Sequence, residues 1–153
     1  MFNRNCVIGA QLPEFDGTTM DGKKIDKSYF EGKVSVINFW FEGCMSCEHE
    51  MPYFNTLVEK YKVKNVNFLA ISLNSPKDIT DFLVTHPYNF DHIAYGEPIT
   101  AGNFKMTWGY PTTLVVDKHL KIIYTTGGVA DENGNVLAHM DLDPKIELAL
   151  NEN

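Results

Sequence analysis

Two near-continuous apolar runs constrain this chain most. They are VSVINFWF, residues 34–41, and VNFLAIS, residues 66–72. Runs that do not alternate between apolar and polar residues are typical of strands buried on both faces, as in a parallel sheet covered by helices. Between the runs, apolar residues recur at the helical spacings of three and four, at Met51, Phe54, Val58 and Tyr61. The order strand, helix, strand predicts a βαβ unit.

Further elements are predicted around this unit. The Asp-Gly turn signal in DGTTMDGKKID, residues 16–26, predicts a hairpin. Helices are predicted at 75–86, with Ser75 as cap and Pro76 next, at 99–106, and at 143–150, with Asp143 as cap and Pro144 next. Strands are predicted at 91–95, 112–117 and 121–126, the last two as a hairpin.

Together these elements predict an α/β fold with a central mixed sheet flanked by helices. Two buried strands are parallel, an antiparallel pair lies at one side, and a small hairpin precedes them. In outline this is a thioredoxin-like arrangement. Residues 1–153 contain no repeat or linker, so we expect one domain, with residues 1–10 as a flexible arm.

Charge and hydropathy exclude several classes of function. The net charge of -7 disfavours nucleic acid and anionic membranes as partners. No apolar run approaches the ~18 residues that a membrane span needs. The first residues, MFNRNCVIGAQ, have too short an apolar run for a signal peptide. We therefore expect either a cytoplasmic protein or one whose targeting segment is absent from this chain.

Cys44 and Cys47 are separated by two residues, at the point where the first apolar run gives way to the predicted helix. The first cysteine of such a pair lies at the helix N-terminus, where unpaired N–H groups and the helix dipole stabilise a thiolate. The second lies one turn later and is usually less exposed. This predicts that Cys44 attacks a substrate disulfide and Cys47 resolves the mixed disulfide. Cys6 is left over, and we expect it to be an inert thiol on the arm.

Metal binding and structural bracing are the competing interpretations of the pair. A structural zinc site needs four ligands, and Cys44 and Cys47 supply two, with no histidine at ligand spacing. A copper-binding module that uses both cysteines and Met45 stays open. A disulfide across two residues closes too short a loop to brace the fold strongly. Redox activity is the favoured interpretation, with no metal and no cofactor beyond the cysteine pair.

Two stretches then resemble a known family. INFWFEGCMSCEHEMPYFNTL, residues 37–57, and WGYPTTLVVDKHLKIIYTTGG, residues 108–128, are similar to the TlpA/ResA-like branch of thioredoxin-fold thiol–disulfide oxidoreductases. The likeness runs from about Gln11 to Gly128. It depends on the combination of Cys-x-x-Cys, EMP and YPTT, because each motif alone is weak. The resemblance implies thiol–disulfide exchange with proteins, with reduction as the expected direction.

The resemblance also implies roles for single residues. Tyr110-Pro111 looks like the family's cis-proline site, where the Tyr110 backbone pairs with an extended substrate segment. Glu50 matches a carboxylate that accepts and returns the proton of the resolving thiol, although a solvated helix acid is its plain alternative. Met45 is expected to add apolar surface beside Cys44. Trp108 either lines the substrate groove or fills core.

Two residues depart from the pattern of the family. Gly43 stands where the family usually has tryptophan, and Asn38 where classical thioredoxins have a buried aspartate. A peroxiredoxin-type peroxidase is the enzymatic alternative, but FWFEGC lacks the proline and threonine expected before its cysteine.

The family resemblance implies a periplasmic or cell-envelope location, a monomer, protein thiol or disulfide substrates, and a reductase or membrane electron donor as partner.

Overall fold

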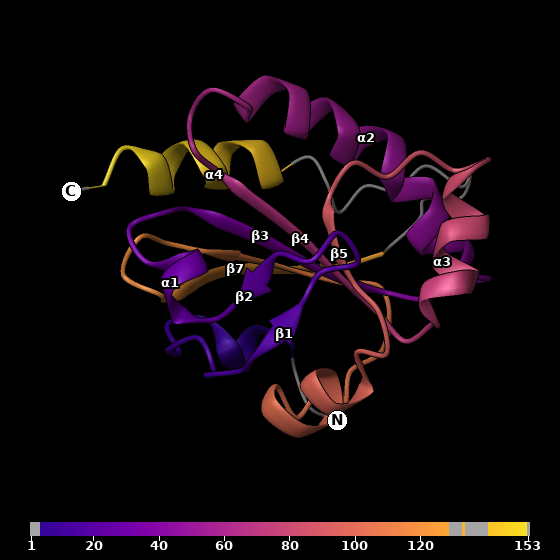
Figure 1. Cartoon of the computed structure of the whole chain (residues 1–153). Helices are drawn as coiled ribbons and strands as arrows, with labels where there is room; N and C mark the ends of the chain where they lie inside the picture. Colours follow the sequence, from indigo (N-terminus) through magenta and orange to yellow (C-terminus); the bar gives the residue numbers. More distant parts are fainter. Residues whose placement is uncertain (1–3, 129–132, 134–140, 153) are drawn as a thin grey trace.

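The structure, a computed structural model, describes residues 4–128, 133 and 141–152. Five strands form one sheet in the order β5-β4-β3-β6-β7, and two short strands form a separate hairpin (Figure 1). The strands are β1 (Gly17–Thr18), β2 (Lys24–Ile25), β3 (Ser35–Trp40), β4 (Asn67–Ser72), β5 (Asp91–Ile93), β6 (Thr112–Val116) and β7 (Ile122–Gly127). The helices are η1 (Arg4–Val7), α1 (Lys27–Phe30), α2 (Met45–Tyr61), α3 (Pro76–Leu83), η2 (Pro98–Asn103) and α4 (Leu142–Leu150).

The central strand of the sheet is β3, and every one of its six residues is buried. It pairs in parallel with β4, which pairs in parallel with β5. On its other side β3 pairs antiparallel with β6, and β6 pairs antiparallel with β7. The hairpin of β1 and β2 is antiparallel as well. The predicted mixed sheet, the parallel βαβ unit and both hairpins are therefore confirmed.

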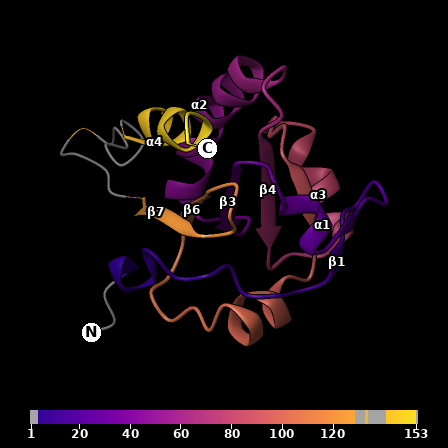
Figure 2. The ribbon, with the colours of Figure 1, turned by 90° about the vertical axis from the view of Figure 1, so that its left-hand side faces the viewer.

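Helices cover both faces of this sheet. One face carries α2, α3 and α4, and Val36 and Trp40 of β3 belong to the apolar cluster beneath them. The other face carries α1, the hairpin and η2, and Ile37 and Phe39 point into that second cluster. The two views show α2 and α4 side by side above the sheet (Figures 1 and 2). Among the described helices, none combines the length and the apolar character that a membrane span requires.

Two helices differ from the sequence prediction. Asp143 is not the cap of the last helix: α4 begins at Leu142, after Asp141. The carboxylate of Asp143 instead accepts hydrogen bonds across the fold from Lys60 and Tyr61, so a tertiary contact replaces the local cap. The helix predicted at 99–106 is a π-helix, η2, which ends at Asn103. The cap at Ser75 is confirmed, because its side chain accepts from the Asp78 N–H at 3.1 Å.

The N-terminal segment is attached to the sheet by its backbone. After the short helix η1, the N–H groups of Gly9 and Leu12 donate to the carbonyl oxygens of Ile122 and Leu120, each at 2.7 Å. The flexible arm expected over residues 1–10 stays a prediction, and its first three residues lie outside the described part. Backbone that runs beside a strand can satisfy its N–H and C=O groups by pairing with that strand. Residue types alone do not reveal such a pairing.

Candidate active site

The chain leaves the central strand β3 and enters α2 through a tight turn. The Cys44 N–H donates to the Phe41 carbonyl oxygen at 3.3 Å, which closes the turn. Gly43 has a φ of +91°, a conformation that residues with a side chain rarely adopt. Its missing Cβ would contact nothing within 4 Å. The preference for glycine at this position is therefore conformational.

Cys44 and Cys47 form a disulfide, with their Cα atoms 5.2 Å apart. Cys44 caps α2, and its sulfur accepts a hydrogen bond from the Cys47 N–H at 3.3 Å. Cys44 is half-buried, whereas Cys47 is 1% exposed. The sulfur that can be reached from outside therefore sits at a helix N-terminus, where a thiolate is stabilised. This arrangement agrees with nucleophile and resolving roles for the two cysteines.

The Tyr110-Pro111 peptide bond is cis, as the resemblance predicts. Pro111 lies beside the cysteine turn, and Gly128, just after β7, fits between them. A Cβ added to Gly128 would lie 2.7 Å from Pro111 Cγ and 2.8 Å from Ser46 Cβ. Three segments that are distant in sequence therefore meet at one place: the Cys-x-x-Cys turn, the cis-proline and the end of the last strand.

Glu50 projects from α2 into the interior, and its exposed fraction is 0%. It shares the buried side of the helix with Cys47, Met51 and Phe54. The interpretation as a solvated surface acid is therefore wrong, because the carboxyl group is removed from water. A carboxyl group one turn after the resolving cysteine, on the same side of the helix, is placed to handle its proton.

A chain of buried polar groups lies beneath the cysteines. The Tyr88 hydroxyl donates to Asn38 Oδ1 at 2.8 Å, and Asn38 Nδ2 donates to Thr113 Oγ1 at 3.0 Å. Burial chiefly, and the charge of Glu50 secondly, raise the pKa of the Tyr88 hydroxyl well above its usual value. On α2, Asn55 Nδ2 donates to the Pro87 carbonyl oxygen at 2.8 Å, which holds the loop that carries Tyr88. Asn38 thus ties three segments together instead of carrying a charge.

Aromatic and sulfur side chains border the exposed side of the site. The rings of Phe41 and Tyr110 meet edge to face, with centroids 5.4 Å apart. Met45 is 70% exposed, which agrees with the apolar surface predicted beside Cys44. Trp108 is half-buried on the loop before the cis-proline, so it is neither a full core residue nor an open surface residue. Trp40, by contrast, lies fully in the core.

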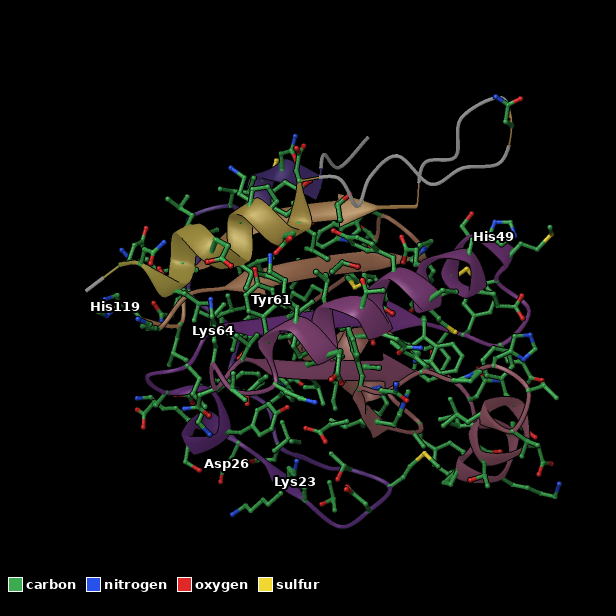
Figure 3. All side chains as sticks on the ribbon, turned by 90° about the horizontal axis from the view of Figure 1, so that it is seen from above. Lys23, Asp26, His49, Tyr61, Lys64 and His119 are labelled. Carbon is green, nitrogen blue, oxygen red and sulfur yellow. A yellow bond between two sulfur atoms is a disulfide. The ribbon has the colours of Figure 1, made fainter. Side chains whose placement is uncertain are left out.

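Glu48 and two histidines lie at the cysteine end of α2. Glu48, next to Cys47, lies 3.6 Å from His86 Nε2, and His49 is exposed at the same end of α2 (Figure 3). Within residues 4–128, 133 and 141–152, no three potential metal ligands of the His, Cys, Asp and Glu types come together. A hollow of about 890 Å³ lies elsewhere, between the Gln11–Asp16 segment and α1, and includes no residue of the cysteine turn.

Sequence reasoning missed two residues of this site. Gly128 is not among the predicted site residues, although the glycine pair at the end of the last strand is a signal for close backbone packing. Tyr88 gave no signal, because it lies on a loop outside every recognised motif. Tertiary packing alone brings its hydroxyl to Asn38.

The sequence matches the AhpC/TSA family over residues 8–125. It is 36% identical over 125 residues to the thiol-disulfide oxidoreductase ResA of Bacillus thuringiensis subsp. konkukian, a match that covers 79% of this chain and 70% of that one.

Solved structures give the same fold. A Chlorobium tepidum protein described as a thiol:disulfide interchange protein DsbE superposes with a TM-score of 0.78 at 24% identity, covering 94% of this chain and 97% of the other. The thioredoxin domain of a Bacteroides vulgatus thiol-disulfide oxidoreductase gives 0.76 at 21% identity, covering 94% and 98%. The fold is therefore thioredoxin-like, and the chain belongs to the AhpC/TSA family and, with its Cys44–Cys47 pair, to the ResA-like thiol–disulfide oxidoreductases.

Proposed function

We propose that this protein exchanges electrons with protein disulfides through Cys44 and Cys47, and that it acts as a reductant. One observation carries the proposal: a reachable sulfur at the start of α2 is bonded to a buried sulfur, directly beside a cis-proline. No cofactor is needed, because the two sulfur atoms themselves hold the exchanged electrons.

The reaction starts from the reduced pair. The Cys44 thiolate attacks one sulfur of a substrate disulfide, that S–S bond breaks, and the departing substrate thiolate takes up a proton. Cys47 then gives its proton to Glu50 and attacks Cys44 Sγ, which forms the intramolecular disulfide and releases the second substrate thiolate. That thiolate takes the proton back from Glu50. Two electrons have moved from the cysteine pair to the substrate, and a dithiol donor must return two electrons for another cycle.

The groups around Cys44 would hold an extended polypeptide. The backbone of Tyr110, before the cis-proline, is placed to pair with a substrate segment by strand addition. Met45 and Trp108 add contact surface near Cys44 and the cis-proline. In this proposal Tyr110, Pro111, Trp108 and Met45 bind substrate, whereas Cys44, Cys47 and Glu50 react.

The partners and the location follow from the family. We propose monomeric action, recharging by a separate reductase or membrane electron donor, and a periplasmic or cell-envelope location. Fractionation of the source cells tests the location. The peroxidase and copper-binding alternatives make opposite predictions, because a peroxidase reduces hydrogen peroxide with Cys47 deleted, and a copper module binds one copper(I) tightly without reducing any disulfide.

The test is the reduction potential of the cysteine pair, titrated in defined thiol–disulfide buffers and read by the mass of alkylated thiols. A value near or below about -230 mV supports a reductant. A value approaching about -120 mV contradicts that direction and indicates a disulfide donor. A pair that cannot be cycled at all overturns the exchange mechanism itself.

A further inference from the structure

An ion pair links the cysteine end of α2 to the segment that follows α3. His86 Nε2 lies 3.6 Å from Glu48 Oε1, and the two side chains are 44% and 26% exposed. Glu48 belongs to the first turn of α2, whereas His86 comes shortly after the end of α3. The contact therefore joins two segments that are far apart in sequence, and its acidic member is partly shielded from water.

The ring of His86 is held in place by its own segment. It stacks on Phe82, with ring centroids 4.2 Å apart and planes within 5° of parallel. Its Nδ1 lies 3.3 Å from the Phe82 carbonyl oxygen and 2.9 Å from Thr85 Oγ1. Carbonyl and carboxylate oxygens only accept hydrogen bonds, and only the protonated imidazole carries a hydrogen on each nitrogen. The charged ring is thus the form that can donate to Phe82 and also present a donor to Glu48.

Glu48 stands one helical turn after Cys44. Its N–H donates to the Cys44 carbonyl oxygen at 3.1 Å, and it is the acidic residue of the first turn of α2. Residues four apart lie on the same side of a helix, with Cβ atoms about 5–6 Å apart. Helical side chains also lean towards the N-terminus of their helix, so the side chain of Glu48 leans towards the cysteine turn.

The two charges of this pair act on a Cys44 thiolate in opposite directions. A carboxylate one turn away disfavours a second negative charge, whereas an imidazolium favours it. An unpaired Glu48 would therefore oppose the helix dipole, which stabilises a thiolate at the start of α2. His86 offsets that opposition because its positive charge lies directly against the carboxylate.

The surrounding charged residues do not duplicate this arrangement. On α2, His49 is exposed and Glu50 is buried. On α3, Asp81 is paired with Lys77 at 2.5 Å, and Asp78 belongs to the first turn, at the opposite end of that helix from His86. Within residues 4–128, 133 and 141–152, no second ion pair includes a residue of the first turn of α2.

We propose that Glu48 and His86 together set the reactivity of Cys44, with His86 offsetting the charge that Glu48 places beside the nucleophile. This inference rests on the proposed function and specifies how the same site is regulated. Both residues act through Cys44, so they are positioning residues. In the reduced protein, the charged pair keeps a larger fraction of Cys44 as thiolate than an unpaired Glu48 would allow.

Coulomb's law gives the size of the effect. At the dielectric constant of water, a charge about 6–7 Å from the sulfur changes the thiolate equilibrium about threefold, and a charge about 10 Å away changes it about twofold. The first figure applies to Glu48, and the second to His86, which lies beyond it. At 1 M salt the screening length falls to about 3 Å, so both effects should shrink.

Alkylation of the reduced protein by iodoacetamide tests the inference, because the thiolate is the reactive form. The rate constant at Cys44, located by peptide mass, is measured at low salt at pH 6 and at pH 9. Their ratio reports the fraction of Cys44 that is ionised at pH 6. We expect Glu48→Gln to raise this ratio about threefold and His86→Gln to lower it about twofold. The double variant should lie between the two single variants.

His119→Gln and Glu59→Gln are the matched controls. His119 is an exposed histidine at the opposite end of the molecule from His49 (Figure 3). Glu59 is an exposed carboxylate in the last turns of α2, about 22 Å along the helix from Cys44. Both controls should keep the ratio of the unchanged protein.

The inference and the proposed function fail in different ways. Equal ratios in all variants, or changes of the same sign in Glu48→Gln and His86→Gln, overturn the inference while leaving the proposed function intact. Opposite changes that persist at full size in 1 M salt overturn it as well, because they would not arise from charge. If the unchanged protein reduces no protein or peptide disulfide, the proposed function is overturned, and the inference with it.

Discussion

The two ends of α2 differ in how far their functional groups are paired within the chain. At its start, Cys44 is half-buried and the side chain of Met45 beside it is 70% exposed. At its far end, Lys60 lies 2.8 Å from Asp143 and Lys64 lies 3.7 Å from Glu147, both on α4. Figure 3 shows this separation, with His49 at the cysteine end and Tyr61 and Lys64 near α4. One end is tied to α4 by ion pairs, and the other carries the reachable sulfur.

This difference suggests a division of labour along one helix. A group that has its partner within the chain contributes to stability, whereas an unpartnered group on the surface is available for binding. Substitutions at the cysteine end should therefore change activity more than the free energy of unfolding. Substitutions at the α4 end should do the reverse.

The largest effect is expected at the cysteines. Cys44→Ser should abolish reduction of protein disulfides, by at least about a thousandfold, because the only reachable sulfur of the pair is lost. Cys47→Ser should instead accumulate a mixed disulfide with substrate, seen as a mass increase that dithiothreitol reverses. The exposed Cys6 supplies the control, since Cys6→Ser should behave as the unchanged protein. A trapped adduct on Cys6 would contradict the assignment of the nucleophile.

The next largest effect is expected at Gly128. Gly128→Ala places a methyl group within 2.8 Å of Pro111 and Ser46, so the cis-proline loop and the cysteine turn must separate. Reduction of a protein disulfide should fall about tenfold or more, because displacements near 1 Å cost up to about a hundredfold in such sites.

Gly102→Ala is the matched control for Gly128. Its Cβ would meet no atom within 4 Å, and the rate should not change. Stopped-flow measurement of both variants decides the matter, with melting temperatures recorded to separate activity from stability. Equal rates for Gly128→Ala and the unchanged protein would show that these segments tolerate separation.

Much of this site follows from local sequence, and the remainder depends on topology. Cys44 and Cys47 were placed correctly because a strand-to-helix junction is encoded by neighbouring residues. The positions of Gly128 and Tyr88 depend on which strands lie side by side, and residue patterns do not contain that information. At Asp143 the local pattern gives the wrong prediction. The sequence favours a helix cap there, but the carboxylate instead accepts a hydrogen bond from Lys60.

Tyr88 lies beneath the cysteines, and its substitution tests whether this residue supports the fold or takes part in the chemistry. Tyr88→Phe removes the donor to Asn38 Oδ1 and leaves a buried acceptor unsatisfied, which should cost about 1–3 kcal/mol of unfolding free energy. We expect the exchange rate per folded molecule to change less than threefold. Urea denaturation and the rate assay measure the two quantities, and Tyr95→Phe, at an exposed tyrosine, should leave stability within about 0.5 kcal/mol. A fall of more than threefold in the exchange rate per folded molecule would show that Tyr88 takes part in the chemistry.

The smallest effect is expected at the α4 end, and it depends on pH. Burial disfavours the charge of Asp143, but hydrogen bonds from Lys60 and Tyr61 outweigh it, so the pKa of Asp143 lies below its usual value. Since the pKa is about 3.9 in the unfolded chain, the stabilisation is fully present above about pH 5 and is lost as the pH falls through the lowered folded value. Asp143→Asn should therefore lose about 1 kcal/mol at pH 7 and show a flatter decline of stability in acid.

Asp81→Asn is the control for this prediction. Its partner Lys77 is exposed on the same helix, so its removal should cost no more than about 0.5 kcal/mol. Urea midpoints between pH 7 and pH 3 compare the two variants, with the exchange rate at pH 7 as a second measurement. If Asp143→Asn slowed exchange while leaving stability unchanged, the two ends of α2 would be coupled. The ion pairs at the α4 end would then help to position the active site.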